Sequence, residues 1–240
     1  MTSFLRAQRR LTLFRLASLP LAGTATLIGL AGGAPAARAS ATAGGASSRA
    51  DALPMARPTL LVLGDSLSAE YGLRRGSGWV AMLAERLASH KPPWATFNAS
   101  ISGETTAGGA TRLPALLAEH RPRVVLIELG GNDALRGLDL AATSRNLEAM
   151  VAAAQAAGAR VLLAGMKVPP NYGRAYTERF EQIFPTLARA RGCALLPFLL
   201  EGVAERLEFF QADRIHPTEA AQPRILANVW PVLAPLLARP

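Results

Sequence analysis

Short apolar runs alternate with longer amphipathic runs from residue 58 to the end of the chain. The short runs have the length and composition of strands, and the longer runs repeat apolar residues at the spacing of a helix face. Strands are predicted at residues 59–63, 95–100, 123–130, 160–166 and 193–198. Helices are predicted at residues 79–88, 110–120, 140–158, 174–192 and 217–237. This alternation indicates an α/β domain with a parallel sheet.

The predicted strands are apolar on both faces, as expected where helices cover both sides of a parallel sheet. Ligands of such sheets bind at the carboxyl ends of the strands. Three polar clusters follow predicted strands, and a fourth lies in the last loop. They are GDSLS (64–68), ISGETT (101–106), GGND (130–133) and DRIHP (213–217). We therefore expect the functional site to combine these segments.

The first 39 residues have a basic start, an apolar middle and a small-residue end, which is the architecture of an export signal. Ala37 and Ala39 form an Ala-x-Ala cleavage site, so the mature chain is expected to begin at Ser40. The alternative is a retained membrane anchor, but Gly, Thr and Pro dilute the apolar stretch. We expect an exported protein, either periplasmic or secreted.

Two nearby segments bear on the export route and on where the folded part begins. Arg9-Arg10 is compatible with twin-arginine export, and the ordinary secretory route stays open as well. Residues 40–57 are small, polar and aperiodic, so they are predicted to form a flexible leader. Residues 58–240 are predicted to form the single folded domain.

The charge balance changes once the signal is set aside. The whole chain carries +9, but the signal holds five of its 26 basic residues and none of its 17 acidic residues, which leaves +4. The remaining basic residues form no run with interleaved aromatic residues, so we expect no nucleic-acid partner. Cys193 is the only cysteine, which excludes an internal disulfide, and its apolar neighbours predict a buried small hydrophobe.

The candidate nucleophile is Ser66, which follows the first predicted strand and precedes a segment predicted to be helical. A nucleophilic serine needs a base and a group that orients the base. His90 and His120 each close an amphipathic helix, where a histidine usually caps carbonyls or faces water. His216 instead precedes a proline and should project from its loop, with Asp213 three residues away to orient its ring.

Acyl transfer also needs donors aimed at the oxygen that becomes negative. Gly103 lets a backbone N–H approach a substrate closely, and Asn132 can present its side-chain NH₂ group. Asp65 is expected to bond backbone amides and hold the turn, and Asp133 to be structural in the same way. Ser68 is expected to cap the first turn of the following helix.

Ser, Gly, Asn and His in this order resemble the SGNH (GDSL) hydrolase family. The resemblance covers nearly the whole mature chain and is closest to the exported bacterial thioesterase I, lysophospholipase and arylesterase group. The segments that carry it are LGDSLSAEYG, NASISGETT, RLPALLAEHRP, ELGGNDALRG, PPNYGRAY and DRIHPTEAAQP. It implies a three-layer α/β/α sandwich resembling flavodoxin, and neither a metal nor an organic cofactor.

The resemblance also implies roles for individual residues. Ser66 would be the nucleophile and would contribute its own N–H to the oxyanion hole, beside the N–H of Gly103 and the side chain of Asn132. Asp213 and His216 would supply the acid and the base. Glu70 departs from the pattern, because close relatives tend to have glycine at this position, so the loop or the charge near the site entrance is expected to differ.

The implied substrates are small-molecule esters or lipids, namely aryl esters, acyl thioesters and lysophospholipids. Val168, Pro169 and Tyr172 match a segment that lines the acyl site in the resembled group, although a Pro-rich turn explains them equally well. The alternative activity is a carbohydrate O-acetyl esterase. A catalytically silent binding protein is the alternative outside the enzymes. We expect a monomer without a membrane span once the signal is removed.

Overall fold

The computed structural model describes residues 57–238, all of which belong to one structural unit, Ala52–Pro240. Five parallel strands form its central sheet in the order β2-β1-β3-β4-β5. The strands are β1 (Thr59–Gly64), β2 (Ala95–Asn98), β3 (Val124–Glu128), β4 (Arg160–Ala164) and β5 (Ala194–Leu196). Because the order reverses at β1, the carboxyl ends of β1 and β3 flank the position where ligands bind in open α/β sheets.

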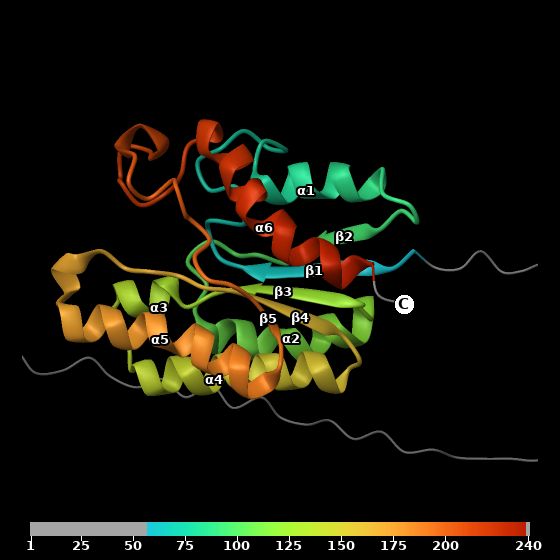
Figure 1. The fold of residues 1–240 in the computed structure, drawn as a ribbon, viewed down its shortest axis with the longest axis horizontal. Coiled ribbons are helices and arrows are strands. Elements are labelled where there is room, and N and C mark those ends of the chain that lie inside the picture. The colour runs from blue at the N-terminus through green and yellow to red at the C-terminus, as the bar shows by residue number, and fades with distance from the viewer. Residues whose placement is uncertain (1–56, 239–240) are drawn as a thin grey trace, which may run out of the picture. The chain divides into compact units, whose positions relative to one another are not determined.

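Helices cover both faces of this sheet. They are α1 (Trp79–Ala88), α2 (Thr106–His120), α3 (Gly131–Leu135), α4 (Leu140–Ala156), α5 (Arg174–Arg191) and α6 (Gln222–Leu237). Figure 1 shows α1 and α6 on one face and α2, α4 and α5 on the other, and each set packs side by side. The predicted three-layer α/β/α sandwich with a flavodoxin-like strand order is therefore confirmed.

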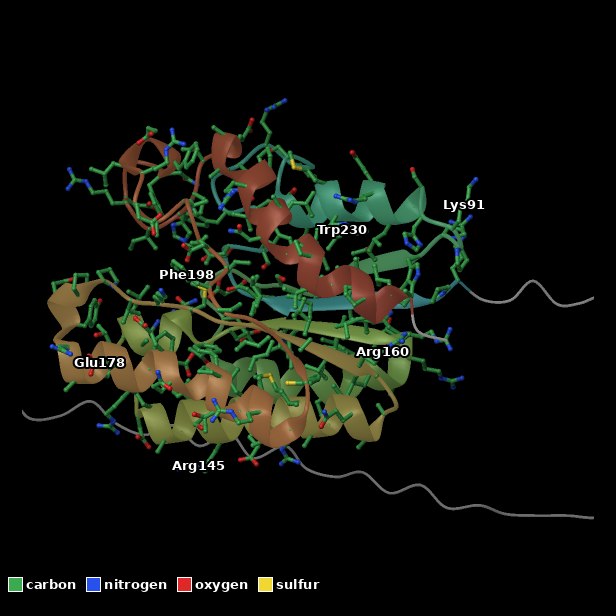
Figure 2. All side chains as sticks on the ribbon, viewed as in Figure 1. Lys91, Arg145, Arg160, Glu178, Phe198 and Trp230 are labelled. Carbon is green, nitrogen blue, oxygen red and sulfur yellow. The ribbon has the colours of Figure 1, made fainter. Side chains whose placement is uncertain are left out.

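The core lies between the sheet and its two helix layers. The apolar side chains of β1 and β3 are buried on both faces, because helices cover both sides. Phe180 and Phe184 of α5 meet edge to face, with ring centroids 5.3 Å apart, under one face. On the other face, the Arg86 guanidinium of α1 lies 3.5 Å from the ring centroid of Trp230 on α6, which Figure 2 labels.

Helix boundaries follow from local chemistry. Thr105 precedes α2, and its hydroxyl accepts a long hydrogen bond of 3.4 Å from the Gly108 N–H. Asp139 caps α4 by accepting from the N–H groups of the next turn. Gly192 ends α5 in the left-handed conformation, with φ 61°. The prediction located these elements to within a few residues, and α2 begins four residues earlier than predicted.

The last helix is the clearest difference from the prediction. It begins at Gln222, after a short 3-10 helix, η3 (Glu219–Ala221), and not at Pro217. Pro217 pairs with Phe210 in an isolated antiparallel bridge, and the Thr218 N–H donates to the Phe209 carbonyl at 2.7 Å. These backbone bonds keep the chain extended beyond His216, so the helix cannot start there.

Candidate active site

Residues 65–71 form a turn after β1 that holds Ser66, the candidate nucleophile, at its bend. This segment is called the nucleophile turn below. The N–H groups of Ser68 and Ala69 donate to the Asp65 carbonyl at 3.2 and 2.9 Å, and the Tyr71 N–H donates to the Ser66 carbonyl. The Leu67 N–H donates to Oδ1 of Asp65 at 3.0 Å. The turn is thus closed by backbone bonds, and the Ser66 hydroxyl is left to point toward the loop that carries His216.

His216 reaches this hydroxyl from the loop that precedes α6. Its Nε2 lies 2.9 Å from Oγ of Ser66, and its Nδ1 lies 2.7 Å from Oδ2 of Asp213. The hydrogen bond from His216 is the main reason why the pKa of Asp213 is lowered to about 2. An ionised carboxylate only accepts, so Nδ1 donates to Asp213 and Nε2 is free to accept the Ser66 proton.

Asp213 holds the loop as well as the ring. Its Oδ1 accepts from the N–H groups of Ile215 and His216 at 2.9 and 3.0 Å. Arg214, between Asp213 and Ile215, adopts the left-handed conformation, with φ 58°. The three-residue spacing of the D-x-x-H motif therefore lets one carboxylate fix both the backbone and the side chain of His216.

The other two candidate oxyanion donors lie after β2 and β3, the strands on either side of β1. Gly103 has φ 79°, a conformation that strains residues with a Cβ atom, so glycine suits this position. Nδ2 of Asn132 donates to Oδ2 of Asp65 at 2.9 Å. An amide NH₂ group has two donors, so this bond orients the group and leaves the second N–H for a substrate oxygen.

The comparisons with known proteins show the family of the chain. The family description "GDSL-like Lipase/Acylhydrolase family" matches residues 62–223, a span that contains Ser66, Gly103, Asn132, Asp213 and His216. The chain belongs to this family. Its fold and its hydrolase class are therefore those that the sequence resemblance implied.

Three relatives illustrate the similarity of this GDSL hydrolase to known proteins. Esterase TesA of Pseudomonas aeruginosa is 54% identical over 182 residues, which cover 76% of this chain and 90% of the relative. Thioesterase 1/protease 1/lysophospholipase L1 of Escherichia coli is 44% identical over 182 residues, covering 76% and 86%. The psychrotrophic esterase EstA from Pseudoalteromonas sp., solved as a complex inhibited by monoethylphosphonate, is 39% identical, with a TM-score of 0.71 and coverage of 75% and 99%.

Sequence reasoning missed one residue of the GDSL hydrolase, Glu128 at the end of β3. This carboxyl is fully buried, and its Oε2 accepts from the Asp65 N–H at 3.2 Å and from the Ser68 hydroxyl at 2.7 Å. A Cβ atom on Gly64 would lie 2.6 Å from Oε2, so only glycine leaves room for the carboxyl. The available signal was an acid at the end of an otherwise apolar strand.

Burial raises the pKa of two carboxyl groups beside the nucleophile turn, those of Asp65 and Glu128. Desolvation raises the pKa of Asp65 to about 6, and it also raises the pKa of Glu128 well above its ordinary value. The negative charge of Asp65 pushes the pKa of Glu128 further up. Glu128 Oε1 has no hydrogen-bond partner, which a neutral carboxylic acid tolerates better than a carboxylate does.

The structure corrects the expectation for Ser68 and supports the expectations for its acidic neighbours. Residues 66–71 form turns and not a helix, so Ser68 caps nothing and donates to Glu128 instead. Asp65 does bond a backbone amide, and in addition it orients Asn132. Asp133 is structural, because its carboxylate accepts from the backbone and hydroxyl of Thr106 at the start of α2.

Glu70 takes an unexpected conformation in this loop. It is left-handed, with φ 59°, and its carboxylate accepts from the N–H of Gly78 at 2.8 Å and from the N–H of Gly76 at 2.9 and 3.1 Å. Gly78 is the residue that precedes α1. Glu70 therefore closes the loop that runs from the nucleophile to α1, and its charge is directed inward onto amide groups.

The candidate acyl-site residues lie on the segment after β4. Val168 is buried, whereas Pro169 and Tyr172 are exposed. The Tyr172 hydroxyl donates to the Leu135 carbonyl at 3.1 Å, which ties this segment to the end of α3, the helix that carries Asn132. A place in substrate binding stays a prediction for all three residues.

The two other histidines and the cysteine do not bond the triad of Ser66, His216 and Asp213. His90 contacts the Pro92 carbonyl, with Nδ1 at 3.2 Å, and His120 stacks on Phe97, with ring centroids 3.7 Å apart. Cys193 is half-buried beside the core, and this burial raises the pKa of its thiol. None of these residues shares a bond with the triad.

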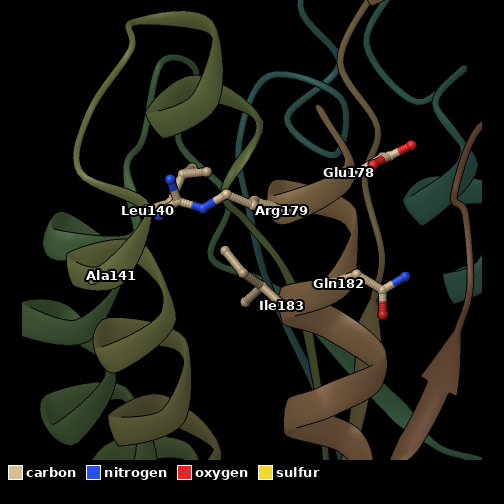
Figure 3. Close-up of a pocket in the computed structure, with 6 residues that line it drawn as sticks. All are labelled: Leu140, Ala141, Glu178, Arg179, Gln182 and Ile183. Carbon is tan, nitrogen blue, oxygen red and sulfur yellow. The ribbon is translucent and has the colours of Figure 1, made fainter. Parts of the chain in front are cut away.

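Two properties hold for residues 57–238 as a whole. No group of three or more His, Cys, Asp or Glu side chains in this range is arranged to hold a metal ion. No helix in the same range combines the length and apolarity needed to cross a bilayer. A pocket of about 340 Å³ opens between α4 and α5 and contains no triad residue (Figure 3). Its lining is Leu140, Ala141, Glu178, Arg179, Gln182 and Ile183.

Proposed function

We propose that Ser66, His216 and Asp213 cleave carboxylic esters and thioesters through an acyl-serine intermediate. The observation that carries this proposal is the unbroken hydrogen-bond chain from Oγ of Ser66 through the imidazole to Asp213, with distances of 2.9 and 2.7 Å. Nucleophile, base and orienting acid are the three parts that serine-based acyl transfer requires.

The first half of the reaction forms the acyl-enzyme. Ser66 Oγ attacks the carbonyl carbon of the substrate while its proton passes to Nε2 of His216. The carbonyl oxygen becomes negative and accepts from the N–H groups of Ser66 and Gly103 and from the second N–H of Asn132. The intermediate collapses, and the leaving alcohol or thiol takes the proton from His216.

The second half restores the enzyme. Water attacks the acyl carbon as it gives a proton to Nε2 of His216, and the same oxyanion donors hold the negative oxygen. The acyl carbon then releases Ser66, whose Oγ takes back the proton. The products are a carboxylic acid and the free enzyme, and no cofactor enters either half.

Aryl esters, acyl thioesters and lysophospholipids are the substrate classes that we assign. The names of the relatives, an esterase and a thioesterase 1/lysophospholipase L1, support these classes over carbohydrate O-acetyl esters. Nitrophenyl esters from acetate upward test the assignment. Medium or long acyl chains should be turned over fastest, and a sharp preference for acetate would overturn it.

The chain is further proposed to act after export, with residues 1–39 removed. The sequence of the N-terminus supports this, and those residues lie outside the described part of the chain. Intact mass measurement of the protein from the cell envelope and medium of a bacterial host should give a chain that begins at Ser40. A full-length protein in the cytoplasm would contradict the proposal.

Covalent labelling tests the catalytic assignment directly. A p-nitrophenyl alkylphosphonate should release one nitrophenol per chain and add the phosphonyl group to Ser66, as read by peptide mass. Ser66→Ala should take no label, whereas the matched control Ser89→Ala, at the exposed end of α1, should label like the wild type. A folded wild type without label would support a silent binding protein instead.

A further inference from the structure

His216 lies on an exposed loop, and Asp213 contacts only one edge of its ring. Asp213, Arg214 and Ile215 are all exposed, and the only β pairing described for this loop is the single bridge at Pro217. A general base on such a loop loses rate when its ring moves by about an ångström from the nucleophile. The face of the imidazole therefore needs a support of its own.

Tyr71 supplies a contact with that face. Its ring centroid lies 4.2 Å from the centroid of the His216 ring, with an angle of 37° between the planes. Tyr71 comes from the loop between β1 and α1, so this tilted ring pair joins the two loops that must meet for catalysis. The aromatic face also favours the cationic imidazole that forms while His216 holds the Ser66 proton.

Gln211 bonds the backbone of both Tyr71 and His216. Its Nε2 donates to the Tyr71 carbonyl at 2.9 Å and to the Pro217 carbonyl at 3.2 Å. Its backbone N–H donates to the His216 carbonyl at 2.8 Å. One residue thus bonds Tyr71 and also the backbone of His216 and of the residue that follows it.

The loop between β1 and α1 leaves room for the Gln211 side chain at Gly72. Gly72 has φ 70°, and a Cβ atom there would lie 2.2 Å from Oε1 of Gln211. A side chain at this position would therefore be strained and would also push Gln211 out of place. The absence of one at Gly72 lets the amide reach the Tyr71 carbonyl.

We propose that Gln211 and Tyr71 are positioning residues for His216, Gln211 by tying the two loops together and Tyr71 by packing its ring against the imidazole. This inference rests on the proposed function, because it assumes that His216 is the base for Ser66. It adds a second support, on the ring face, to the one that Asp213 provides at the ring edge.

A second link between the same loops offers a matched control. The Arg74 guanidinium donates to both carboxylate oxygens of Glu219, and the Arg74 backbone N–H donates to Oε1, at 2.8 to 3.3 Å. This pair touches neither Tyr71 nor His216. Glu219→Gln weakens the link between the loops without altering the support of the imidazole.

The test measures kcat and KM with p-nitrophenyl butyrate, together with the rate and final extent of phosphonate labelling. Gln211→Ala, Gln211→Glu and Tyr71→Leu should each lower kcat and the labelling rate by roughly tenfold, with KM within about twofold. Tyr71→Phe keeps the ring and should restore most of kcat. Glu219→Gln should stay within about twofold of the wild type. Urea unfolding confirms that each variant is folded under assay conditions.

Separate results overturn this inference and the proposed function. No label on the folded wild type removes the proposed function itself. Full labelling of the wild type with unchanged kcat in Gln211→Glu and Tyr71→Leu removes the positioning role alone. A rise in KM without loss of kcat in Tyr71→Leu would make Tyr71 a substrate contact. An equal loss in Glu219→Gln would mean that any tie between the loops suffices.

Discussion

Asp65 and Ser66 are neighbours in the chain, yet their side chains serve different partners. Ser66 is bonded to His216, whereas Asp65 bonds the turn and the Asn132 amide. Two acids therefore act on the site at different points. Asp213 bonds His216, the proposed base, and Asp65 bonds Asn132, a proposed oxyanion donor.

Asparagine substitutions at these two acids should separate their effects. Asp213→Asn removes the acceptor that sets the tautomer of His216, so kcat should fall by about ten-thousandfold. Asp65→Asn keeps an oxygen for the Leu67 N–H but loses the acceptor for the Asn132 amide, so the fall should not exceed roughly a hundredfold. Steady-state kinetics with one nitrophenyl ester measures both. A larger loss for Asp65→Asn would reverse the two roles.

The buried carboxyl of Glu128 predicts an unusual pH dependence of stability. Its pKa is raised in the folded state, so the folded protein binds more protons than the unfolded chain. The contribution of Glu128 is complete below about pH 4.5 and is lost as the pH rises through its folded-state pKa. Asp65, raised from 3.8 to about 6, acts in the same direction.

Glutamine cannot ionise, so the Glu128→Gln variant should not lose the part of its stability that ionisation of Glu128 removes from the wild type. The free energy of unfolding of the variant, measured in urea between pH 4.5 and 8, should gain on that of the wild type as the pH rises. Glu128→Gln also keeps an acceptor for Ser68 and the Asp65 N–H, so the turn should be preserved. Parallel curves for the two proteins would show that Glu128 does not titrate as inferred.

At the scale of elements, the loop between β1 and α1 lacks helix and strand and is held by side-chain bonds to its backbone. Glu70 accepts from Gly76 and Gly78, and the Trp79 indole N–H donates to the Leu67 carbonyl at 3.1 Å. These bonds give shape to the segment that presents Ser66 and Tyr71.

Two substitutions separate the bonds of Glu70 from its backbone strain. Glu70→Ala and Glu70→Gly both lose the bonds to the loop amides, but only alanine keeps a Cβ atom in the left-handed conformation. Glu70→Ala should therefore unfold about 1 kcal/mol more easily than Glu70→Gly. Urea titrations of the two variants test the difference, and equal stabilities would show that φ at this position relaxes.

Hydrophobic patterning predicts these elements well because β1, β3, β4 and their helices bury continuous apolar faces. It fails where distant partners decide the outcome. Glu128 meets Asp65 and Ser68 from 63 and 60 residues away, and Gln211 meets Tyr71 from 140 residues away. No local pattern reports such pairs, so motifs suggested Ser66, Asp213 and His216 as candidates, whereas Glu128 and Gln211 could not be predicted as their neighbours.

At the scale of the whole molecule, the sheet order decides where the site lies. β1 sits between β2 and β3, so the segments that carry Ser66, Gly103 and Asn132 leave neighbouring strands at the same edge. The alternation of strands and helices predicted a parallel sheet, and the motif resemblance supplied its flavodoxin-like form. The packing of β1 against β3 thus supports both the fold and the site.

The central strands should therefore dominate stability. Leu126 of β3 is fully buried, and Leu126→Ala should lower the free energy of unfolding by about 3 kcal/mol through lost burial and a cavity. Leu207 is 71% exposed, and Leu207→Ala should change the free energy of unfolding by less than about 0.5 kcal/mol. Urea unfolding of the two variants measures both changes. Similar values for the two variants would contradict the assignment of the core.

Ser66 and its base are separated by 150 residues of chain. During synthesis the ribosome completes the nucleophile turn long before it makes the segment with Asp213 and His216. Under the proposed mechanism, a growing polypeptide that has already folded its early strands should be silent toward esters. Turnover should begin only after the last loop has been added and docked, so the appearance of activity would mark the completion of the native topology.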